Sequence, residues 1–269
     1  MEHKIAAAFV LALALLLAGC GSSSSSMKNS DPAAGISGNW QMSLQKSNST
    51  LAPKTQSGSL VQNGNVVTGS VIFTNLPCSG VANVSGTVNG STVSLEVAPV
   101  GTTINLSGAV ETGRGQPSMS GSYTIFSTGC VGSQTAPQSG TFIGNMVSPL
   151  NGSIAGTFAS KPYHTTYSLT GQVTQGANTG ASSTPLSGSL TFTGFCYATA
   201  NIVGLISGDS VVMTLVDASG ARIGQVTGTI ALDATALNGS YEIAGLGQGA
   251  SKDCVDGSMG TVTLAIAGK

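Results

Sequence analysis

The sequence predicts an all-β protein in which two eight-stranded antiparallel up-and-down barrels follow one another, the product of an internal duplication. Three observations predict this fold. Apolar residues alternate with Ser, Thr, Asn or Gly almost continuously after residue 35, as expected of strands with one buried face. Segments of the first half recur in the second half. Two-residue turns such as Asn63-Gly64 and Asn89-Gly90 separate consecutive strands, which predicts antiparallel hairpins.

The duplication is recognised by residues that recur at a constant spacing. Gly121 and Tyr123 match Gly239 and Tyr241, 118 residues later. Self-similarity at a fixed spacing over glycine, aromatic and cysteine positions indicates a repeated structural unit of roughly 110–120 residues. Further matches are Gly38 with Gly156, Trp40 with Phe158 and Cys78 with Cys196 at the same spacing, and Cys130 with Cys254 at a spacing of 124.

The chain begins with a predicted secretory signal, residues 1–19. A short positive segment precedes an uncharged apolar run over residues 5–17, which is shorter than the roughly 20 residues of a spanning helix. The run ends in Leu17-Ala18-Gly19-Cys20, which resembles the lipobox of bacterial lipoproteins. The resemblance implies that the Cys20 thiol is acylated and that this cysteine becomes the first residue of the mature protein. An ordinary signal peptide with a cysteine near the cleavage site is the alternative.

Residues 20–35 form a predicted tether between the lipid anchor and the folded part of the chain. Five serines at 22–26 and the Asp31-Pro32 pair are typical of a flexible segment that does not pack. Gly21 stands where enteric-type lipoproteins that stay at the inner membrane carry aspartate, so the resemblance implies an outer-membrane location. Several acyl chains, each contributing about 0.8 kcal/mol per buried methylene, anchor such a protein stably. We therefore expect a membrane as its partner.

The composition excludes several function classes. Only 7% of the residues are charged, and the formal net charge is −1. Removing residues 1–19 takes away Glu2 and Lys4, so the net charge of the mature chain is still −1. Nucleic-acid binding needs clustered Lys and Arg, and here these residues are scattered. The regular recurrence of Val, Ile, Leu and Phe also argues against a disordered chain.

The period-2 segments fall into two sets of eight, in predicted domains of residues 36–147 and 150–269. In the first domain the predicted strands lie near residues 36–44, 58–62, 66–74, 81–88, 92–97, 103–111, 118–126 and 140–147. In the second they lie near residues 150–158, 166–174, 186–193, 201–206, 210–216, 223–232, 237–244 and 259–267.

Closure of each set into a barrel is predicted because most strands carry a glycine on the same face as their large apolar residues. Glycine inside a strand weakens it unless a tight bend or a close backbone approach requires it. Closure also removes the edges that invite aggregation. Only Ser148-Pro149 separates the two sets, so tandem β-sandwiches and one larger closed sheet are alternatives.

Four cysteines besides Cys20 permit three disulfide pairings. In an up-and-down meander all odd-numbered connections lie at one end, and the four cysteines fall in odd-numbered connections. Treating both halves alike predicts Cys78 with Cys130 and Cys196 with Cys254. Each bond would close a loop of some 50–60 residues and stabilise the fold by roughly 4 kcal/mol in the chain-entropy model.

The sequence offers little that predicts catalysis or metal binding. The one histidine after residue 19 is His164, in a predicted solvated turn. Acidic residues fall at strand ends or on polar faces, and the densest pair, Asp253 and Asp256, is interpreted as a solvated loop and not as a calcium site, which usually draws six or more oxygen ligands. No cysteine pair has zinc-finger spacing. We therefore expect no enzyme activity, no cofactor and no metal.

Gly38-Asn39-Trp40 near the start of an exported meander is similar to the Gly-Xaa-Trp of lipocalins and avidin-like barrels. The resemblance implies ligand binding inside a barrel. The interior aromatics Trp40, Tyr123, Phe158 and Tyr241 are then the candidate ligand-binding residues. The function expected first is a lipid-anchored, non-catalytic module that binds a small hydrophobic or envelope-derived ligand. The alternative is a structural or adhesive surface lipoprotein, and an enzyme of unknown type is the third possibility. The oligomeric state stays open.

Overall fold

The computed structural model describes residues 33–269 except 75–79, 114, 128–136, 248–251 and 269. The strands of the first half are β1 (Gly38–Lys46), β2 (Lys54–Asn63), β3 (Val66–Thr74), β4 (Gly80–Asn89), β5 (Thr92–Ala98), β6 (Thr102–Glu111), β7 (Ser118–Ser127) and β8 (Gln138–Val147). Those of the second half are β9 (Gly152–Ser160), β10 (Thr166–Gln175), β11 (Thr184–Thr193), β12 (Thr199–Ser207), β13 (Ser210–Val216), β14 (Arg222–Ile230), β15 (Ala236–Ile243) and β16 (Ser258–Ala267). All sixteen predicted strands are confirmed, and a short helix, α1 (Lys252–Asp256), was not predicted.

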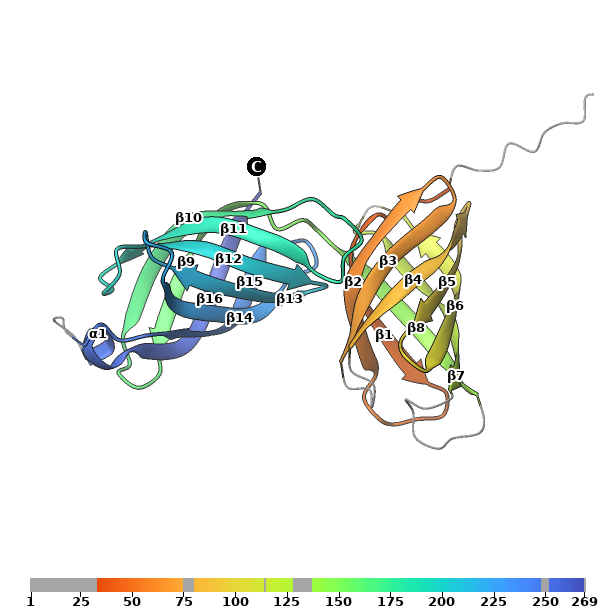
Figure 1. The fold of residues 1–269 in the computed structure, drawn as a ribbon, viewed down its shortest axis with the longest axis horizontal. Coiled ribbons are helices and arrows are strands. Elements are labelled where there is room, and N and C mark those ends of the chain that lie inside the picture. The colour runs from red at the N-terminus through yellow and green to blue at the C-terminus, as the bar shows by residue number, and fades with distance from the viewer. Residues whose placement is uncertain (1–32, 75–79, 114, 128–136, 248–251, 269) are drawn as a thin grey trace, which may run out of the picture. The chain divides into compact units, whose positions relative to one another are not determined.

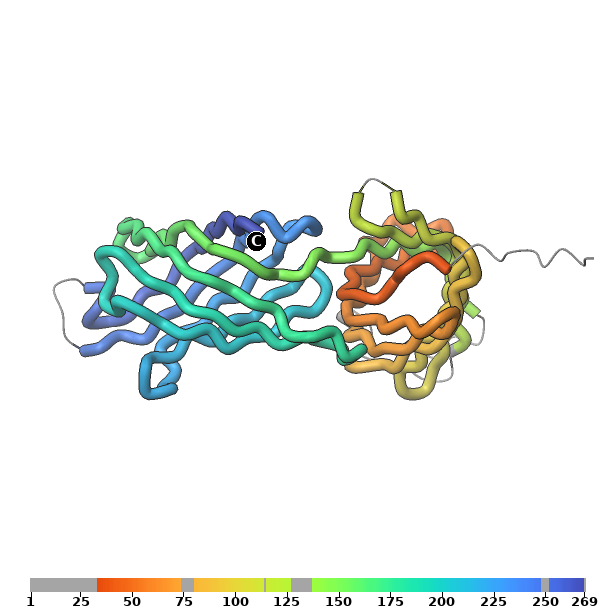
Figure 2. The backbone as a smooth tube through the Cα atoms, turned by 90° about the horizontal axis from the view of Figure 1, so that it is seen from above, coloured from red at the N-terminus to blue at the C-terminus, as the bar shows by residue number. Residues whose placement is uncertain are grey.

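Each half closes into its own antiparallel barrel (Figure 1). Consecutive strands pair throughout. β8 returns to pair with β1, and β16 returns to pair with β9. Figure 2 shows strands β1–β8 running round as a closed ring. The predicted tandem barrels are therefore confirmed, and the alternatives of sandwiches and of one larger sheet are wrong. We call the two units barrel 1 (β1–β8) and barrel 2 (β9–β16).

The interior of each barrel is a hydrophobic core. Along most strands every second residue is buried, as in β5 and β10, whereas β2 is buried on both faces over residues 56–60. The buried side chains of barrel 1 form one cluster and those of barrel 2 form another. Eight strands enclose an interior just wide enough for side chains to fill, so these inward residues pack against one another across each barrel.

Inward-facing glycines allow neighbouring strands to approach closely. Gly108 of β6 and Gly121 of β7 lie opposite each other, and so do Gly228 of β14 and Gly239 of β15. A Cβ on Gly121 would lie within 3.0 Å of the Ser107 carbonyl oxygen and of the Gly108 Cα. Only a residue without a side chain fits there, and the tight crossing bends the sheet toward closure.

The strand register confirms the duplication but corrects two of its matches, those of Gly38 with Gly156 and of Trp40 with Phe158. Phe142 and Val262 are equivalent, because each pairs with the repeated glycine of the preceding strand. Phe142 pairs with Leu44, and Val262 pairs with Phe158. Leu44 is therefore the equivalent of Phe158, and the predicted match of Trp40 with Phe158 is wrong by four residues. The similarity of the two Gly-Xaa-aromatic segments is local and does not follow the register of the barrels.

Residues 32–269 form one compact unit, in which hydrogen bonds join the two barrels. The buried Asn39 side chain donates to the Gly208 carbonyl at 2.6 Å and accepts from the Gly208 N–H at 2.7 Å. The connection between β10 and β11 also contacts barrel 1. Its Asn178 side chain donates to the Leu60 carbonyl at 2.7 Å. The long even-numbered connection of barrel 2, which has no counterpart in barrel 1, thus serves as an inter-barrel contact.

The close approach of β6 and β7 predicts that Gly121→Ala destabilises the protein by about 1–3 kcal/mol, because the added methyl group must displace backbone atoms. Gly113→Ala is the matched control, since no atom lies within 4 Å of the position of its added Cβ. The control should change stability by less than about 0.5 kcal/mol. Urea unfolding of both variants measures the difference, and equal midpoints would contradict the close-approach argument.

Closure of each half by its own first and last strands predicts that residues 36–147 and 150–269 each fold when expressed alone in an oxidising compartment. Each half has more than 100 residues, enough for a core of its own. Loss of the Asn39 and Asn178 contacts should lower the stability of each half without preventing folding. Circular dichroism with cooperative thermal unfolding is the measurement. Halves that are soluble only when mixed would contradict independent closure.

Candidate functional site

The four aromatic residues predicted to bind ligand all lie in the barrel cores. Trp40 is 0% exposed and Tyr123 is 4% exposed in barrel 1, while Phe158 is 1% exposed and Tyr241 is 3% exposed in barrel 2. The Trp40 indole N–H donates to the Ile36 carbonyl at 2.8 Å. A ligand at the centre of either barrel would have to displace core side chains.

Phe158 and Tyr241 belong to an aromatic cluster at one end of barrel 2. Their rings stack with centroids 4.2 Å apart and an interplanar angle of 11°. Phe158 also contacts Phe192, with centroids 5.5 Å apart, and Tyr167 contacts Phe195 at 4.7 Å. Such aromatic pairs contribute about 0.5–1.5 kcal/mol each beyond their burial. The cluster fills this end of barrel 2 with side chains.

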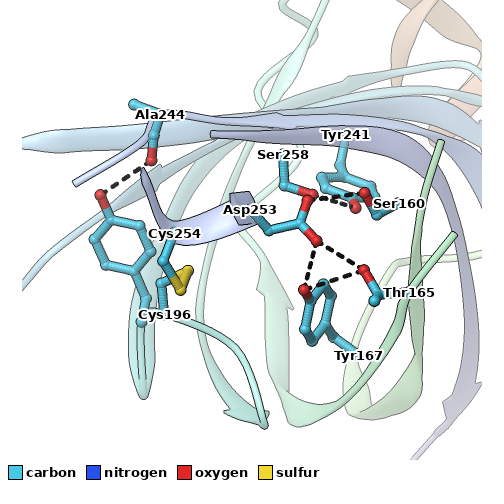
Figure 3. Close-up of a disulfide and its surroundings, with 10 residues drawn as sticks. Ser160, Thr165, Tyr167, Cys196, Tyr241, Ala244, Asp253, Cys254 and Ser258 are labelled. Carbon is cyan, nitrogen blue, oxygen red and sulfur yellow. Dashed lines mark hydrogen bonds between the residues drawn. A yellow bond between two sulfur atoms is a disulfide. The ribbon is translucent and has the colours of Figure 1, made fainter. Parts of the chain in front are cut away.

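A disulfide and a short helix close the same end of barrel 2 (Figure 3). Cys196, in the connection between β11 and β12, is bonded to Cys254 of helix α1, with Cα atoms 5.3 Å apart. The predicted Cys196–Cys254 disulfide is therefore confirmed. Cys78, Cys130 and Cys20 lie outside the described residues, so their predicted bond and lipid attachment stay predictions.

Asp253 of helix α1 lies inside a cage of hydroxyl groups (Figure 3). Its side chain is 2% exposed. Its carboxylate accepts hydrogen bonds from the Ser160 hydroxyl at 2.8 Å, the Thr165 hydroxyl at 2.7 Å and the Tyr167 hydroxyl at 2.6 Å. Next to this cage the hydroxyls of Tyr241 and Ser258 lie 2.8 Å apart. The cage draws on β9, β10, β15, β16 and the turn that joins β9 to β10.

The cage keeps the Asp253 carboxylate ionised. Burial raises the pKa of Asp253, but hydrogen bonds from Tyr167, Thr165, Ser258 and Ser160 outweigh that effect and hold its pKa below the ordinary value. Burial raises the pKa of Tyr241, so its phenol keeps its proton. Hydrogen bonds to the charged form are what make a buried carboxylate tolerable. Asp253 and the disulfide together fasten helix α1 across the end of the barrel.

The interpretation of Asp253 as part of a solvated loop is wrong, because the sequence does not show the tertiary contacts that bury it. One feature of the sequence could have indicated its burial. Asp253 precedes Cys254, and the predicted disulfide of Cys254 holds this segment at the end of the barrel. Asp256, three residues later, is exposed and accepts a hydrogen bond from the Tyr163 hydroxyl at 3.0 Å.

Metal ligands do not come together in the part of the chain that the structure describes. No group of three or more His, Cys, Asp or Glu side chains is found there that could hold a metal ion. His164 lies in the exposed turn between β9 and β10, with a positive φ of 54°, as predicted for a turn residue. In the same described ranges, no helix is long and apolar enough to cross a membrane.

A groove with a volume of about 720 Å³ lies on the outer face of barrel 2. It crosses β14, β15, β16 and β9, and its polar groups include the hydroxyls of Thr227, Ser240 and Thr261. Lys161 and Glu242 also line it, so it carries one charge of each sign. The volume lies within the range of small-ligand pockets, about 300–1,000 Å³. Its chemistry suits a neutral ligand rich in hydroxyl groups.

A second, smaller cavity of about 50 Å³ lies at one end of barrel 1. Leu44, Tyr123 and Ile125 form apolar walls, and Lys46 and Lys54 line it from β1 and β2. The connections from β1 to β2 and from β7 to β8 lie at this end of barrel 1. The equivalent end of barrel 2 is the one that helix α1 and the disulfide close.

Comparison with known proteins adds no functional assignment. No protein-family model matches the chain, and no curated protein sequence matches it.

The hydroxyl cage predicts that Asp253→Ala destabilises the protein by about 1–3 kcal/mol, because the caged hydroxyls lose a charged acceptor. The effect of the charge depends on pH. Since the pKa of Asp253 in the folded protein lies below its unfolded value of about 3.9, the carboxylate stabilises the fold above that pH. This stabilisation is lost as the pH falls through the folded pKa.

The stability difference between the wild-type protein and Asp253→Asn should therefore be largest at neutral pH and should shrink below about pH 4. Denaturant unfolding across the range from pH 7 to pH 2.5 measures it. Asp256→Asn removes an exposed charge from the same helix and is the control, expected to change stability by less than about 0.5 kcal/mol. If the stability difference between the wild-type protein and Asp253→Asn did not change with pH, the negative charge of Asp253 would not contribute to stability.

Proposed function

We propose that this chain is a lipid-anchored, non-catalytic protein of the bacterial cell envelope with a structural or adhesive role. The observation that carries the proposal is the packing of both barrel interiors. The side chains predicted to bind a hydrophobic ligand inside a barrel are core residues, between 0% and 4% exposed. The cell-envelope location and the outer-membrane anchor rest on the lipobox resemblance at Cys20.

The outer surface supports a structural or adhesive role. On β4, β7 and β10 the exposed positions are mostly Ser, Thr and Asn. Closed barrels expose no strand edges for pairing with other chains, and only 7% of the residues are charged. A disulfide further restricts unfolding of barrel 2. These properties are those of a stable, nearly neutral module at a cell surface, whose contacts would be hydrogen bonds made by hydroxyl groups.

The outer groove of barrel 2 favours a second candidate function, the binding of an envelope-derived glycan. Hydroxyl and amide groups are the natural partners of a neutral saccharide, and the groove presents Gln225 beside Thr227, Ser240 and Thr261. Met259, 55% exposed, adds an apolar surface within the same groove. In this second candidate function the protein is also non-catalytic, and its ligand binds on the outer face of barrel 2 instead of in the barrel interior.

An anchored structural role predicts that the function depends on Cys20. In the native host, deletion of the gene should weaken adhesion of the cells or the integrity of their envelope. Expression of the wild-type chain should restore the phenotype, and Cys20→Ser should not. Labelling with radioactive palmitate, followed by membrane fractionation, should show incorporation into the wild-type chain and none into Cys20→Ser. Full restoration by Cys20→Ser would contradict the anchored role.

Native mass spectrometry of the chain purified from its host separates the two candidate functions. A mass equal to the lipidated polypeptide alone supports the structural role. A retained saccharide that is lost in the double variant Thr227→Val and Ser240→Ala supports the groove. Retention of a hydrophobic molecule by the wild-type chain would contradict both and would return the ligand to the barrel interior.

A further inference from the structure

The two barrels present different chemistry at equivalent ends. In barrel 2 this end holds the Asp253 carboxylate in its hydroxyl cage. The equivalent positions in barrel 1 follow from the strand register. Gly140 and Gly260 are equivalent, because they pair with the repeated tyrosines Tyr123 and Tyr241. Lys46 pairs with Gly140, and Ser160 pairs with Gly260. Lys46 therefore occupies the position of Ser160.

The second strand of each barrel shows a similar replacement of a hydroxyl side chain by a lysine. Leu44 pairs with Lys54, and its equivalent Phe158 pairs with Tyr167. Lys54 therefore occupies the position of Tyr167. Two of the three hydroxyls that bond the Asp253 carboxylate in barrel 2 are thus replaced by ammonium groups in barrel 1. A site that receives an anion in one barrel has become cationic in the other.

Barrel 1 provides no carboxylate of its own to this end. In barrel 2 the connection between β15 and β16 carries Asp253 and Asp256. The four odd-numbered connections of barrel 1 span residues 47–53, 75–79, 99–101 and 128–137, and none of them contains Asp or Glu in the sequence. The nearest acidic residues along these strands are Glu96, on the exposed face of β5, and Glu111, at the opposite end of β6. Barrel 1 therefore supplies no Asp or Glu from these connections to neutralise the two lysines.

Space for a small anionic group lies between these side chains. The cavity of about 50 Å³ is lined by Lys46 and Lys54 together with Tyr123, Leu44 and Ile125. Lys46 is exposed at the rim and Lys54 is half-buried, whereas Tyr123, Leu44 and Ile125 are almost fully buried. The cavity therefore combines two cations with an apolar wall, and it has room for the charged end of a small ligand.

Barrel 1 also has a polar side chain deeper in its interior, at a position where barrel 2 has an apolar one. Gln56 follows Lys54 on the inward face of β2, is 1% exposed, and has an amide oxygen without a hydrogen-bond partner among the described residues. Its equivalent by register is Leu169, since Gln56 pairs with Met42 and Leu169 pairs with Gly156. A buried unpaired oxygen is costly, and this one lies two residues along β2 from Lys54.

We propose that this end of barrel 1 is a binding site for an organic carboxylate with a short aliphatic chain. The carboxylate lies between the Lys46 and Lys54 ammonium groups, as the Asp253 carboxylate lies among hydroxyls in barrel 2. The aliphatic chain contacts the apolar wall of Leu44 and Ile125. Charge-assisted hydrogen bonds to two ammonium groups supply most of the affinity. The site is separate from the outer groove of barrel 2 and does not depend on the proposed structural role.

Equilibrium dialysis of the full chain, purified in a nonionic detergent, against radiolabelled hexanoate tests the proposal. A protein-free detergent blank corrects for partition into micelles. We expect saturable uptake of one hexanoate per chain and no saturable uptake of hexylamine, which has the same aliphatic chain and the opposite charge. Lys46→Gln and Lys54→Gln should each weaken binding about tenfold, and the double variant should abolish it.

Lys252→Gln is the matched control, because it removes an exposed lysine from helix α1 of barrel 2 and should leave hexanoate binding unchanged. The double variant Lys46→Ser and Lys54→Tyr installs the residues of barrel 2 and should also lose binding. Thermal unfolding confirms that each variant is folded. No saturable uptake by the wild-type chain, or unchanged uptake by the Lys46→Gln and Lys54→Gln double variant, would overturn the proposal. Inorganic phosphate that competes as strongly as hexanoate would also overturn it, by showing a general anion site.

Discussion

The close approach of backbone to backbone at inward-facing glycines is the constraint on which the rest of the structure depends. Where Gly108 crosses Gly121 and Gly228 crosses Gly239, no side chain fits between the strands. The strands can therefore bend tightly enough for eight of them to form a ring. Once the ring is closed, its interior has room for side chains and little else. The buried aromatics and the packed cores follow from this geometry.

Because side chains fill the barrel interiors, the polar and charged groups available for binding lie at the ends and on the outer faces of the barrels. The ends differ because the duplicated units exchanged a few inward residues while keeping their glycines. Barrel 2 fastens a helix across its end with a disulfide and an aspartate. Barrel 1 carries lysines at equivalent positions. The equivalent ends of the two barrels thus differ: that of barrel 2 is covered by helix α1, and that of barrel 1 carries two lysines. A duplicated domain can acquire a separate role in this way without a change in fold.

Much of the fold was readable from the sequence, because period-2 alternation and Asn-Gly turns are local signals. They located all sixteen strands and the antiparallel connectivity, and the repeated glycines indicated closure. The match of Trp40 with Phe158 failed because residue similarity within one strand does not report which residues pair across strands. Helix α1 was missed because five residues are too few to show a helical period. The burial of Asp253 arises from contacts with residues more than 80 positions away, which no local pattern contains.

Pairing between the first and last strands of each barrel has an evolutionary consequence. In an eight-stranded meander the chain enters and leaves at the same end, so its two ends are neighbours in space. A complete copy can then be appended by a connection as short as the one around Ser148-Pro149 without breaking any strand pairing. Further copies could therefore be added or removed by recombination at that junction. New N- and C-termini opened in an exposed hairpin, with the original ends joined, would leave the same ring intact.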